Sequence, residues 1–179
     1  MTHTTSPAFT ITHLTPAAFD RSVPGLAALL AETVAGGSSL GFVAPFDHDA
    51  AAAWWRTQRP AVADGTLDIW VTEASEGITG TISLAHPGKP NGRHRAEIVK
   101  LLVHHAARGQ GLGRALLTTA EQSAARSGFR LLLLDTESDS AADRLYRSTG
   151  WTPYGTVPAY ATGPEGELRD CTFFYKEVG

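Results

Sequence analysis

The sequence predicts an α/β (α+β) fold with a single mixed central sheet of about seven strands flanked by about four helices. Segments that alternate polar and apolar residues come in pairs early and late in the chain, which is typical of antiparallel hairpins. Between them, the strand-like stretch 95–103 leads through a glycine-rich turn and a helix to the fully apolar run 131–134. That order is typical of a buried strand reached by a crossover, so the sheet combines both kinds of pairing.

The N-terminal half begins with a polar stretch, and we expect residues 1–7 to be a disordered tail before a single domain at 8–179. Thr15 followed by Pro16 is typical of an N-cap and the first turn of a helix, with Pro24 as a kink or break. The predicted elements are a strand at 9–14, a helix ending at Gly36-Gly37, a helix beginning at Asp47 and a hairpin of strands at 67–72 and 78–84.

The C-terminal half repeats the change from strand to helix twice before a last hairpin. Its predicted elements are a strand at 95–103, a helix at 114–127, a strand at 131–134, a short helix at 140–148 and a hairpin of strands at 151–161 and 170–176.

Composition excludes several classes of protein. The 179 residues carry 15 basic and 18 acidic side chains with no basic run, so nucleic-acid binding has little support. The single cysteine, Cys171, precludes an intramolecular disulfide, and its apolar surroundings in the sequence favour a buried strand thiol over a nucleophile. No apolar run is long enough for a membrane span and no signal peptide is evident. We expect a cytoplasmic protein, either a monomer or a homodimer.

The most informative motif is the turn Arg108-Gly109-Gln110-Gly111-Leu112-Gly113, which follows a strand and opens a helix. Glycines let the backbone approach a ligand, and the free N–H groups of the helix start bind phosphate oxygens. A P-loop is excluded because Gly113 is followed by Arg114-Ala115. A dinucleotide fingerprint lacks its glycine at position 114. The acid Asp135 after the next strand keeps that alternative open, but the late position of the turn disfavours it.

The turn and a downstream segment together resemble the GCN5-related N-acetyltransferase (GNAT) family. The downstream match is a helix carrying Ala142-Asp143-Arg144-Leu145-Tyr146, followed by Gly150-Trp151. The chain departs from the family at His105, where many members have proline, and at Asp139, where many have asparagine. The resemblance implies acetyl-CoA as cofactor, in contact with Leu101, Leu102, Val103, Arg108, Gly109, Gln110, Gly111, Leu112, Gly113, Arg114 and Asp139.

The resemblance extends along nearly the whole chain to a member of the family that acetylates a toxic amino acid. The matching runs include Glu32-Thr33-Val34, Lys89-Pro90-Asn91-Gly92, Arg95-Ala96-Glu97, Lys100-Leu101, Ala107-Arg108-Gly109, Leu134-Asp135-Thr136-Glu137, and Pro158 with Tyr160. This resemblance implies that Glu97 and Asp135 accept the proton of the amine, directly or through water.

Acetyl transfer to an amine requires a base for the amine, donors for the carbonyl oxygen and a proton for the departing thiolate. Glu97 and Asp135 are the predicted bases and Tyr146 the predicted acid. From the residues alone, Asp135 as a cap of the next turn, Glu97 as a solvated charge and Tyr146 as a core aromatic remain alternatives. For the oxyanion we expect a backbone N–H of Leu102 or Val103, freed where the strands splay.

The predicted acceptor site is built from Gly37, Ser38, Phe42, Trp55 and Tyr160, with Lys100 and Arg95 as cations for a carboxylate. His104 and His105 are adjacent, so in a strand their side chains point to opposite faces. No spacing of histidine, cysteine and acidic residues suggests a zinc site, and we predict no metal.

The sequence therefore predicts an acetyl-CoA-dependent N-acetyltransferase that acts on the amine of a small, amino-acid-like toxin or antibiotic. Acetylation of a peptide or protein amino group is the alternative among enzymes. A catalytically inert acyl-CoA sensor is the alternative from another class, and the combination of Glu97, Asp135 and Tyr146 argues against it.

Overall fold

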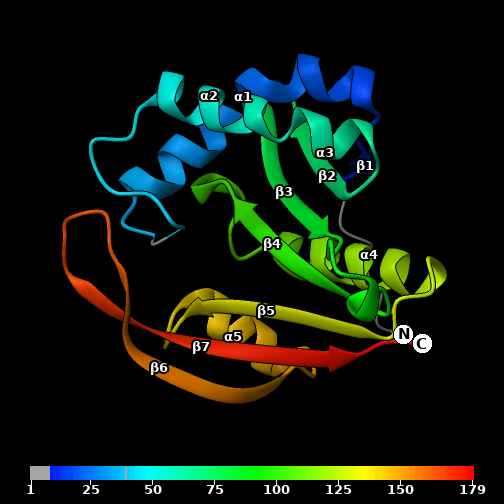
Figure 1. Ribbon diagram of the computed structural model, residues 1–179. Helices are drawn as coiled ribbons and strands as arrows, with labels where there is room; N and C mark the ends of the chain where they lie inside the picture. Colours follow the sequence, from blue (N-terminus) through cyan, green and yellow to red (C-terminus); the bar gives the residue numbers. More distant parts are fainter. Residues whose placement is uncertain (1–8, 39) are drawn as a thin grey trace, which may run out of the picture.

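The computed structural model describes residues 9–38 and 40–179, so the expected tail at 1–7 lies outside the described residues. Its strands and α-helices follow one another along the chain (Figure 1). They are β1 (Ile11–His13), α1 (Pro16–Ala35), α2 (His48–Thr57), α3 (Arg59–Ala63), β2 (Leu67–Ala74), β3 (Gly77–Ala85), β4 (Arg95–Val103), α4 (Leu112–Arg126), β5 (Leu131–Glu137), α5 (Ala141–Ser148), β6 (Thr152–Thr162) and β7 (Leu168–Glu177), with 3₁₀ turns at Pro90–Gly92 and His105–Ala107.

The seven strands form one mixed sheet in the order β1-β2-β3-β4-β5-β7-β6. Among the described strands, β4 and β5 alone pair in parallel, and every other neighbouring pair is antiparallel. The predicted mixed sheet and its crossover are thus confirmed. The described part of the chain has five α-helices rather than about four, because the short α3 was not predicted.

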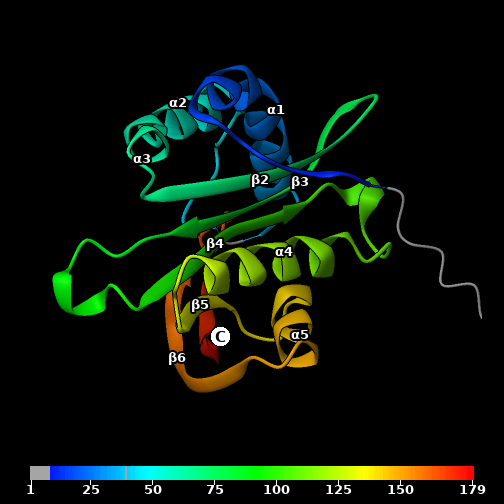
Figure 2. The same ribbon diagram turned by 90° about the vertical axis from the view of Figure 1, so that its right-hand side faces the viewer.

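The helices cover both faces of the sheet (Figure 2). Helices α1, α2 and α3 lie over β2, β3 and β4, and their apolar side chains form one core cluster with residues such as Phe19, Leu26 and Ile69. On the other face, α4 and α5 form a second cluster that includes Leu116, Leu132 and Phe174. The sheet therefore carries a buried layer on each side.

Local chemistry explains where the helices begin. The Thr15 hydroxyl accepts the N–H of Ala18 at the start of α1, and the Asp47 carboxylate accepts that of Ala50 at the start of α2. These are the expected N-cap contacts. Helix α1 continues through Pro24 to Ala35, so of the two expectations for Pro24, a kink or a break, the break is wrong. The lost backbone donor is tolerated in a helix whose inner side is buried in the core.

Strands β4 and β5 part after a short paired stretch. Their ladder runs from Arg95↔Leu131 to Glu97↔Leu133 and goes no further. Figure 1 shows the two strands together at one end and diverging toward the other. On the β3 side, β4 carries an extra residue between the pairs Ser83↔Val99 and Thr81↔Leu102. This bulge bends β4 and positions the site described next.

Candidate active site

The glycine turn is shaped by backbone conformations that favour glycine. Gly109 and Gly111 have φ of 75° and 81°, and Gly111 is the N-cap of α4 with no side chain capping it. The first hydrogen bond of the helix runs from Ala115 to the carbonyl of Gly111. The N–H groups of the three residues before Ala115 therefore have no acceptor within the helix. Such a start is suited to phosphate oxygens.

A cavity of about 420 Å³ opens in front of this turn. Of the eleven residues predicted to contact the cofactor, nine line it: Leu101, Leu102, Val103, Arg108, Gly109, Gly111, Leu112, Gly113 and Arg114. Gln110 does not, and its side-chain amide donates to the carbonyl of Ala106 at 3.2 Å. Asp139 also lies outside the lining, in a left-handed turn before α5 with φ of 61°.

A second cavity, of about 300 Å³, lies between the diverging halves of β4 and β5 and the hairpin β6–β7. Asp135, Tyr146, Lys100 and Cys171 line it. Both cavities share the lining residues Leu40, Leu101, Thr136, Glu137 and Ala142. They therefore adjoin at the place where β4 and β5 separate, so a ligand in one can reach a ligand in the other.

The two predicted bases lie on the same face of the sheet. Glu97 pairs with Leu133 in the parallel ladder, and Asp135 is two residues further along β5. Burial raises the pKa of Glu97, and the nearby Asp135 carboxylate raises it further. Asp135 lines the second cavity directly, whereas Glu97 stands beside it at the last paired position.

Tyr146 projects from α5 and is 5% exposed. Its ring packs between Trp151 and Phe174, with centroids 5.8 and 5.9 Å away. Burial and the charge of Asp135 raise the pKa of the phenol well above its usual value. No described residue hydrogen-bonds to the hydroxyl, which belongs to a side chain that lines the second cavity. The ring is therefore a core aromatic, as one alternative held, while its hydroxyl stays available to a ligand.

The backbone conformation and the contacts of Lys100 could not be predicted from the sequence. It sits at the bulge of β4 with φ of 53°, a left-handed conformation that is rare outside glycine. Its ammonium donates to the carbonyl of Leu40 at 2.9 Å and lies 5.2 and 5.0 Å from the ring centroids of Phe42 and Trp54. Burial lowers the pKa of Lys100, and Asp135 opposes that shift. A non-glycine residue at a bulge gives no signal in the pattern of the sequence.

The predicted acceptor-binding residues do not line a single cavity. Tyr160 lines the second cavity, whereas Ser38 lines the cavity in front of the glycine turn, called the cofactor-side cavity below. Gly37 and Phe42 line neither, although Phe42 contacts Lys100. Trp55 was assigned wrongly: it is fully buried in the core, where its indole N–H donates to the carbonyl of Leu26 at 3.1 Å.

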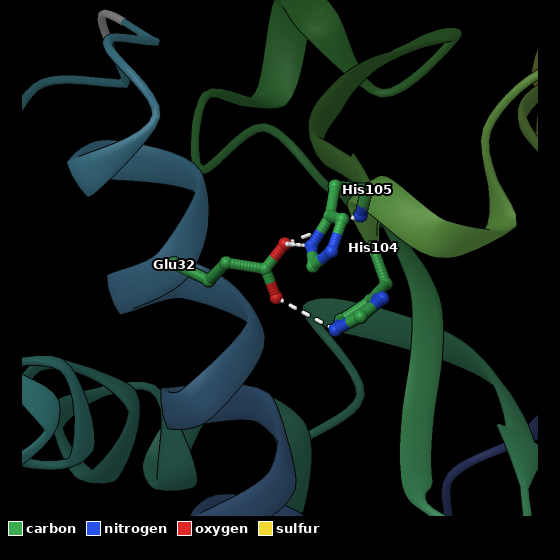
Figure 3. Close-up of side chains that lie close together, drawn as sticks. All are labelled: Glu32, His104 and His105. Carbon is green, nitrogen blue, oxygen red and sulfur yellow. Dashed lines mark hydrogen bonds and ion pairs between the residues drawn. The ribbon is translucent and has the colours of Figure 1, made fainter.

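Two further expectations require correction. Arg95 is the first residue of β4, away from the bulge that carries Lys100; it lies against Gly92 and lines neither cavity. His104 and His105 do not point to opposite faces, because β4 ends at Val103 and the 3₁₀ turn begins. Their rings lie 4.5 Å apart and both face Glu32 of α1 (Figure 3).

Among the described helices, none is both long and apolar enough to cross a membrane.

The sequence matches known proteins over much of its length. Residues 38–151 match the family described as Acetyltransferase (GNAT) family. Human N-acetyltransferase 8B is 34% identical over 108 residues, which are 59% of this chain and 48% of that protein. The chain thus spans about half the length of the first curated relatives it matches. An L-methionine sulfoximine/L-methionine sulfone acetyltransferase of Salmonella typhimurium is 29% identical over 133 residues, 74% of this chain and 75% of that protein.

Solved structures share the fold. Ribosomal-protein-alanine N-acetyltransferase from Brucella melitensis superposes with a TM-score of 0.76 at 25% identity, covering 94% of this chain and 99% of that one. A phosphinothricin acetyltransferase from Sinorhizobium meliloti, in complex with acetyl-CoA, superposes with a TM-score of 0.75 at 19% identity, covering 96% and 89% of the two chains. At 19% identity, the likeness to the Sinorhizobium structure shows a shared fold and nothing more.

Proposed function

The chain belongs to the acetyltransferase (GNAT) family, and from this premise we propose that it transfers the acetyl group of acetyl-CoA to the amine of a small amino acid. The observation that carries the proposal is the junction of the two cavities where β4 and β5 part. One cavity has a phosphate-binding helix start. The other has a carboxylate, a phenol and a partly desolvated ammonium.

On the cofactor side, the glycine turn and the free N–H groups at the start of α4 would hold the pyrophosphate of acetyl-CoA. Arg108 and Arg114 add positive charge at the rim of the same cavity. The thioester end then reaches the residues that both cavities share. On this proposal the acetyl group would lie near Leu101 and Ala142, which line both cavities.

The chemistry follows from the groups around that point. An acceptor amine loses a proton to Asp135, or through water to Glu97, and attacks the thioester carbonyl to form the carbon–nitrogen bond. The backbone N–H of Leu102 or Val103 stabilises the negative carbonyl oxygen. As the carbon–sulfur bond breaks, Tyr146 supplies a proton to the thiolate of coenzyme A and regains one from the amine through solvent.

The acceptor side favours a substrate with its own carboxylate. Lys100 lines the second cavity and uses one of its three N–H groups on Leu40. The other cation there, Arg169, is already held by Glu137 at 2.6 and 2.7 Å and by Glu167. Among the described residues that line this cavity, Lys100 is therefore the cation available to an acceptor carboxylate, and Asp135 would face the amine.

The proposed acceptor class is toxic amino acids and their analogues. The matching runs noted above resemble the tabtoxin resistance protein, whose substrate is tabtoxinine-β-lactam. The Salmonella relative is described as acting on L-methionine sulfoximine and L-methionine sulfone, also amino-acid analogues. On this proposal the protein protects its cell from such a compound.

The test is steady-state kinetics with acetyl-CoA and three kinds of acceptor: L-methionine sulfone, its methyl ester and a peptide with a free amino terminus. We expect the free amino acid to react best and the ester to lose kcat/KM, because the ester has no charge for Lys100. In Lys100→Met that preference should disappear, whereas Lys89→Met, at an exposed loop lysine, should keep it.

Turnover of the peptide alone would reject the small-acceptor proposal and favour a protein amino terminus. That alternative is supported by the likeness to the Brucella enzyme named for a ribosomal protein alanine. Acetyl-CoA binding without release of thiol for any acceptor would instead favour an inert sensor.

A further inference from the structure

Outside the proposed active site, three side chains from two separate parts of the chain converge on one point (Figure 3). Glu32 projects from the last turns of α1, and His104 and His105 follow the end of β4. One carboxylate oxygen of Glu32 lies 2.6 Å from Nδ1 of His105, and the other lies 2.9 Å from Nε2 of His104. The carboxylate comes from α1, and the two imidazoles come from the segment that follows β4.

We propose that Glu32, His104 and His105 form a binding site for one divalent transition-metal ion, with Zn²⁺ as the best match. Two imidazoles and a carboxylate are ligands that zinc binds, at about 2.0–2.2 Å, with water completing the set. The three ligand atoms lie within 4.8 Å of one another, and among the described residues no other group of three does so. Ligands of one tetrahedral zinc lie about 3.4 Å apart, so side-chain rotations close the site.

The burial of the three residues suits an ion that enters from solvent. The side chains of Glu32 and His104 are both 32% exposed, and that of His105 is 70% exposed. Glu32 also accepts the backbone N–H of His105 at 3.1 Å, which holds its carboxylate in place. The site therefore presents a carboxylate beside two imidazole nitrogens.

Each histidine reaches the ion differently. Nδ1 of His105 donates to Glu32 at 2.6 Å, so binding zinc through Nδ1 displaces that proton and leaves the ring proton on the exposed Nε2. His104 faces Glu32 with Nε2, while its Nδ1 accepts the N–H of Ala106 at 3.2 Å. Binding zinc through Nε2 moves the ring proton to Nδ1, so the contact with Ala106 must open. Zinc binding should accordingly speed hydrogen exchange at the Ala106 amide.

An ion here joins α1 to the segment that leads into the glycine turn. His105 begins the 3₁₀ turn that ends at Ala107, directly before Arg108. The metal would act as a clip between these elements and stabilise the folded chain by mass action.

The test is equilibrium dialysis of the full chain, stripped of metal and of any affinity tag, against micromolar zinc. We expect one zinc per chain and a rise in thermal stability. His105→Ala and Glu32→Gln should each weaken zinc binding by more than the roughly 10–100-fold typical of losing an outer partner. Because His105 is exposed, its alanine variant should fold normally, which circular dichroism checks.

His13→Ala is the matched control. His13 and His86 also flank a carboxylate, at 2.9 Å from the two oxygens of Asp68, but their ligand atoms do not converge on one point. Zinc binding should be unchanged in this variant. Less than one equivalent of zinc in the unmodified chain, equal binding in a folded His105→Ala variant, or loss in His13→Ala alone would overturn the proposal.

Discussion

The thiol of Cys171 lies 3.2 Å from Oδ2 of Asp135 and donates to it across the pairing of β7 with β5. The same thiol lies 3.1 Å from the carbonyl of Thr136. Burial raises the pKa of Cys171 to about 12, and its contact with the Asp135 carboxylate contributes. The cysteine thus stays protonated at neutral pH although it lines the proposed acceptor cavity.

A protonated thiol is a poor nucleophile, so we expect direct transfer without an acetylated cysteine. Mass spectrometry of the protein incubated with acetyl-CoA alone should show no acetyl group on Cys171. Kinetics with both substrates varied should be sequential rather than ping-pong. Cys171→Ala should keep most of the rate, since its role is one hydrogen bond to the base. A stable acetyl-cysteine would contradict direct transfer.

Glu97→Gln and Asp135→Asn should each lower kcat, by up to about 10²–10⁴-fold. The loss should shrink at high pH, where more of the amine is already neutral. A pH–rate profile from weakly acidic to alkaline pH measures both effects. Glu73→Gln, at an exposed position of β2, is the control that should keep full rate. Full activity of both active-site variants near neutral pH would mean that neither carboxylate is the base.

Glu97→Gln should also be more stable than the unmodified chain above the acidic range. The pKa of Glu97 is raised in the folded state, so folding favours the protonated form. The stabilisation that protonation gives is present at low pH and is lost as pH rises from the ordinary glutamate value through the raised one. Glutamine does not ionise, so the variant does not lose this stability as pH rises. Thermal denaturation at pH 4 and pH 8 should therefore show a smaller decline for the variant, and an equal decline would contradict the raised pKa.

Gly111→Val should lower the affinity for acetyl-CoA in a chain that still folds. Gly111 has φ of 81° at the start of α4, and Gly128 has φ of 86° just past its end. Neither position has an atom within 4 Å of an added Cβ, so valine strains the backbone at both. Only Gly111 lines the cofactor-side cavity. Calorimetry should show reduced affinity for Gly111→Val and normal affinity for folded Gly128→Val, and equal affinities would reject the phosphate assignment.

Tyr146→Phe should lower kcat with little change in acetyl-CoA affinity. The ring contacts with Trp151 and Phe174 remain, and only the hydroxyl is lost. A proton delivered to the thiolate is needed in the transition state, so its loss appears in kcat. Stopped reactions analysed for free thiol measure the rate, and a thermal melt checks the fold. A large fall in melting temperature with a proportionate fall in activity would favour a purely structural tyrosine.

The elements that follow strong local patterns could be predicted from the sequence. Strand β4 has the predicted bounds 95–103, and Ser140 and Asp47 cap the helices that follow them. The glycine turn also predicted most of the cofactor-side lining, because its backbone geometry depends on the residues within it.

The remainder depends on contacts between distant segments. Trp54 and Trp55 are neighbours in α2, yet one ring faces Lys100 and the other fills the core, which only the docking of α2 decides. The convergence of His104 and His105 on Glu32 needs the end of β4 to meet α1, 73 residues away in sequence from His105. The bulge that turns Lys100 to its rings is likewise set by its partner strand.

The short ladder between β4 and β5 is a narrow connection within the sheet. The final hairpin reaches the rest of the sheet through β5, and β5 holds β4 through three residue pairs. Within the sheet, the N-terminal four strands and the C-terminal three therefore meet through this ladder alone, although the apolar cluster under α4 and α5 also joins them. We expect a ligand that spans the opening to brace the two parts. Amide protons along Ile98–Val103 and Asp135–Glu137 should exchange more slowly once acetyl-CoA is bound.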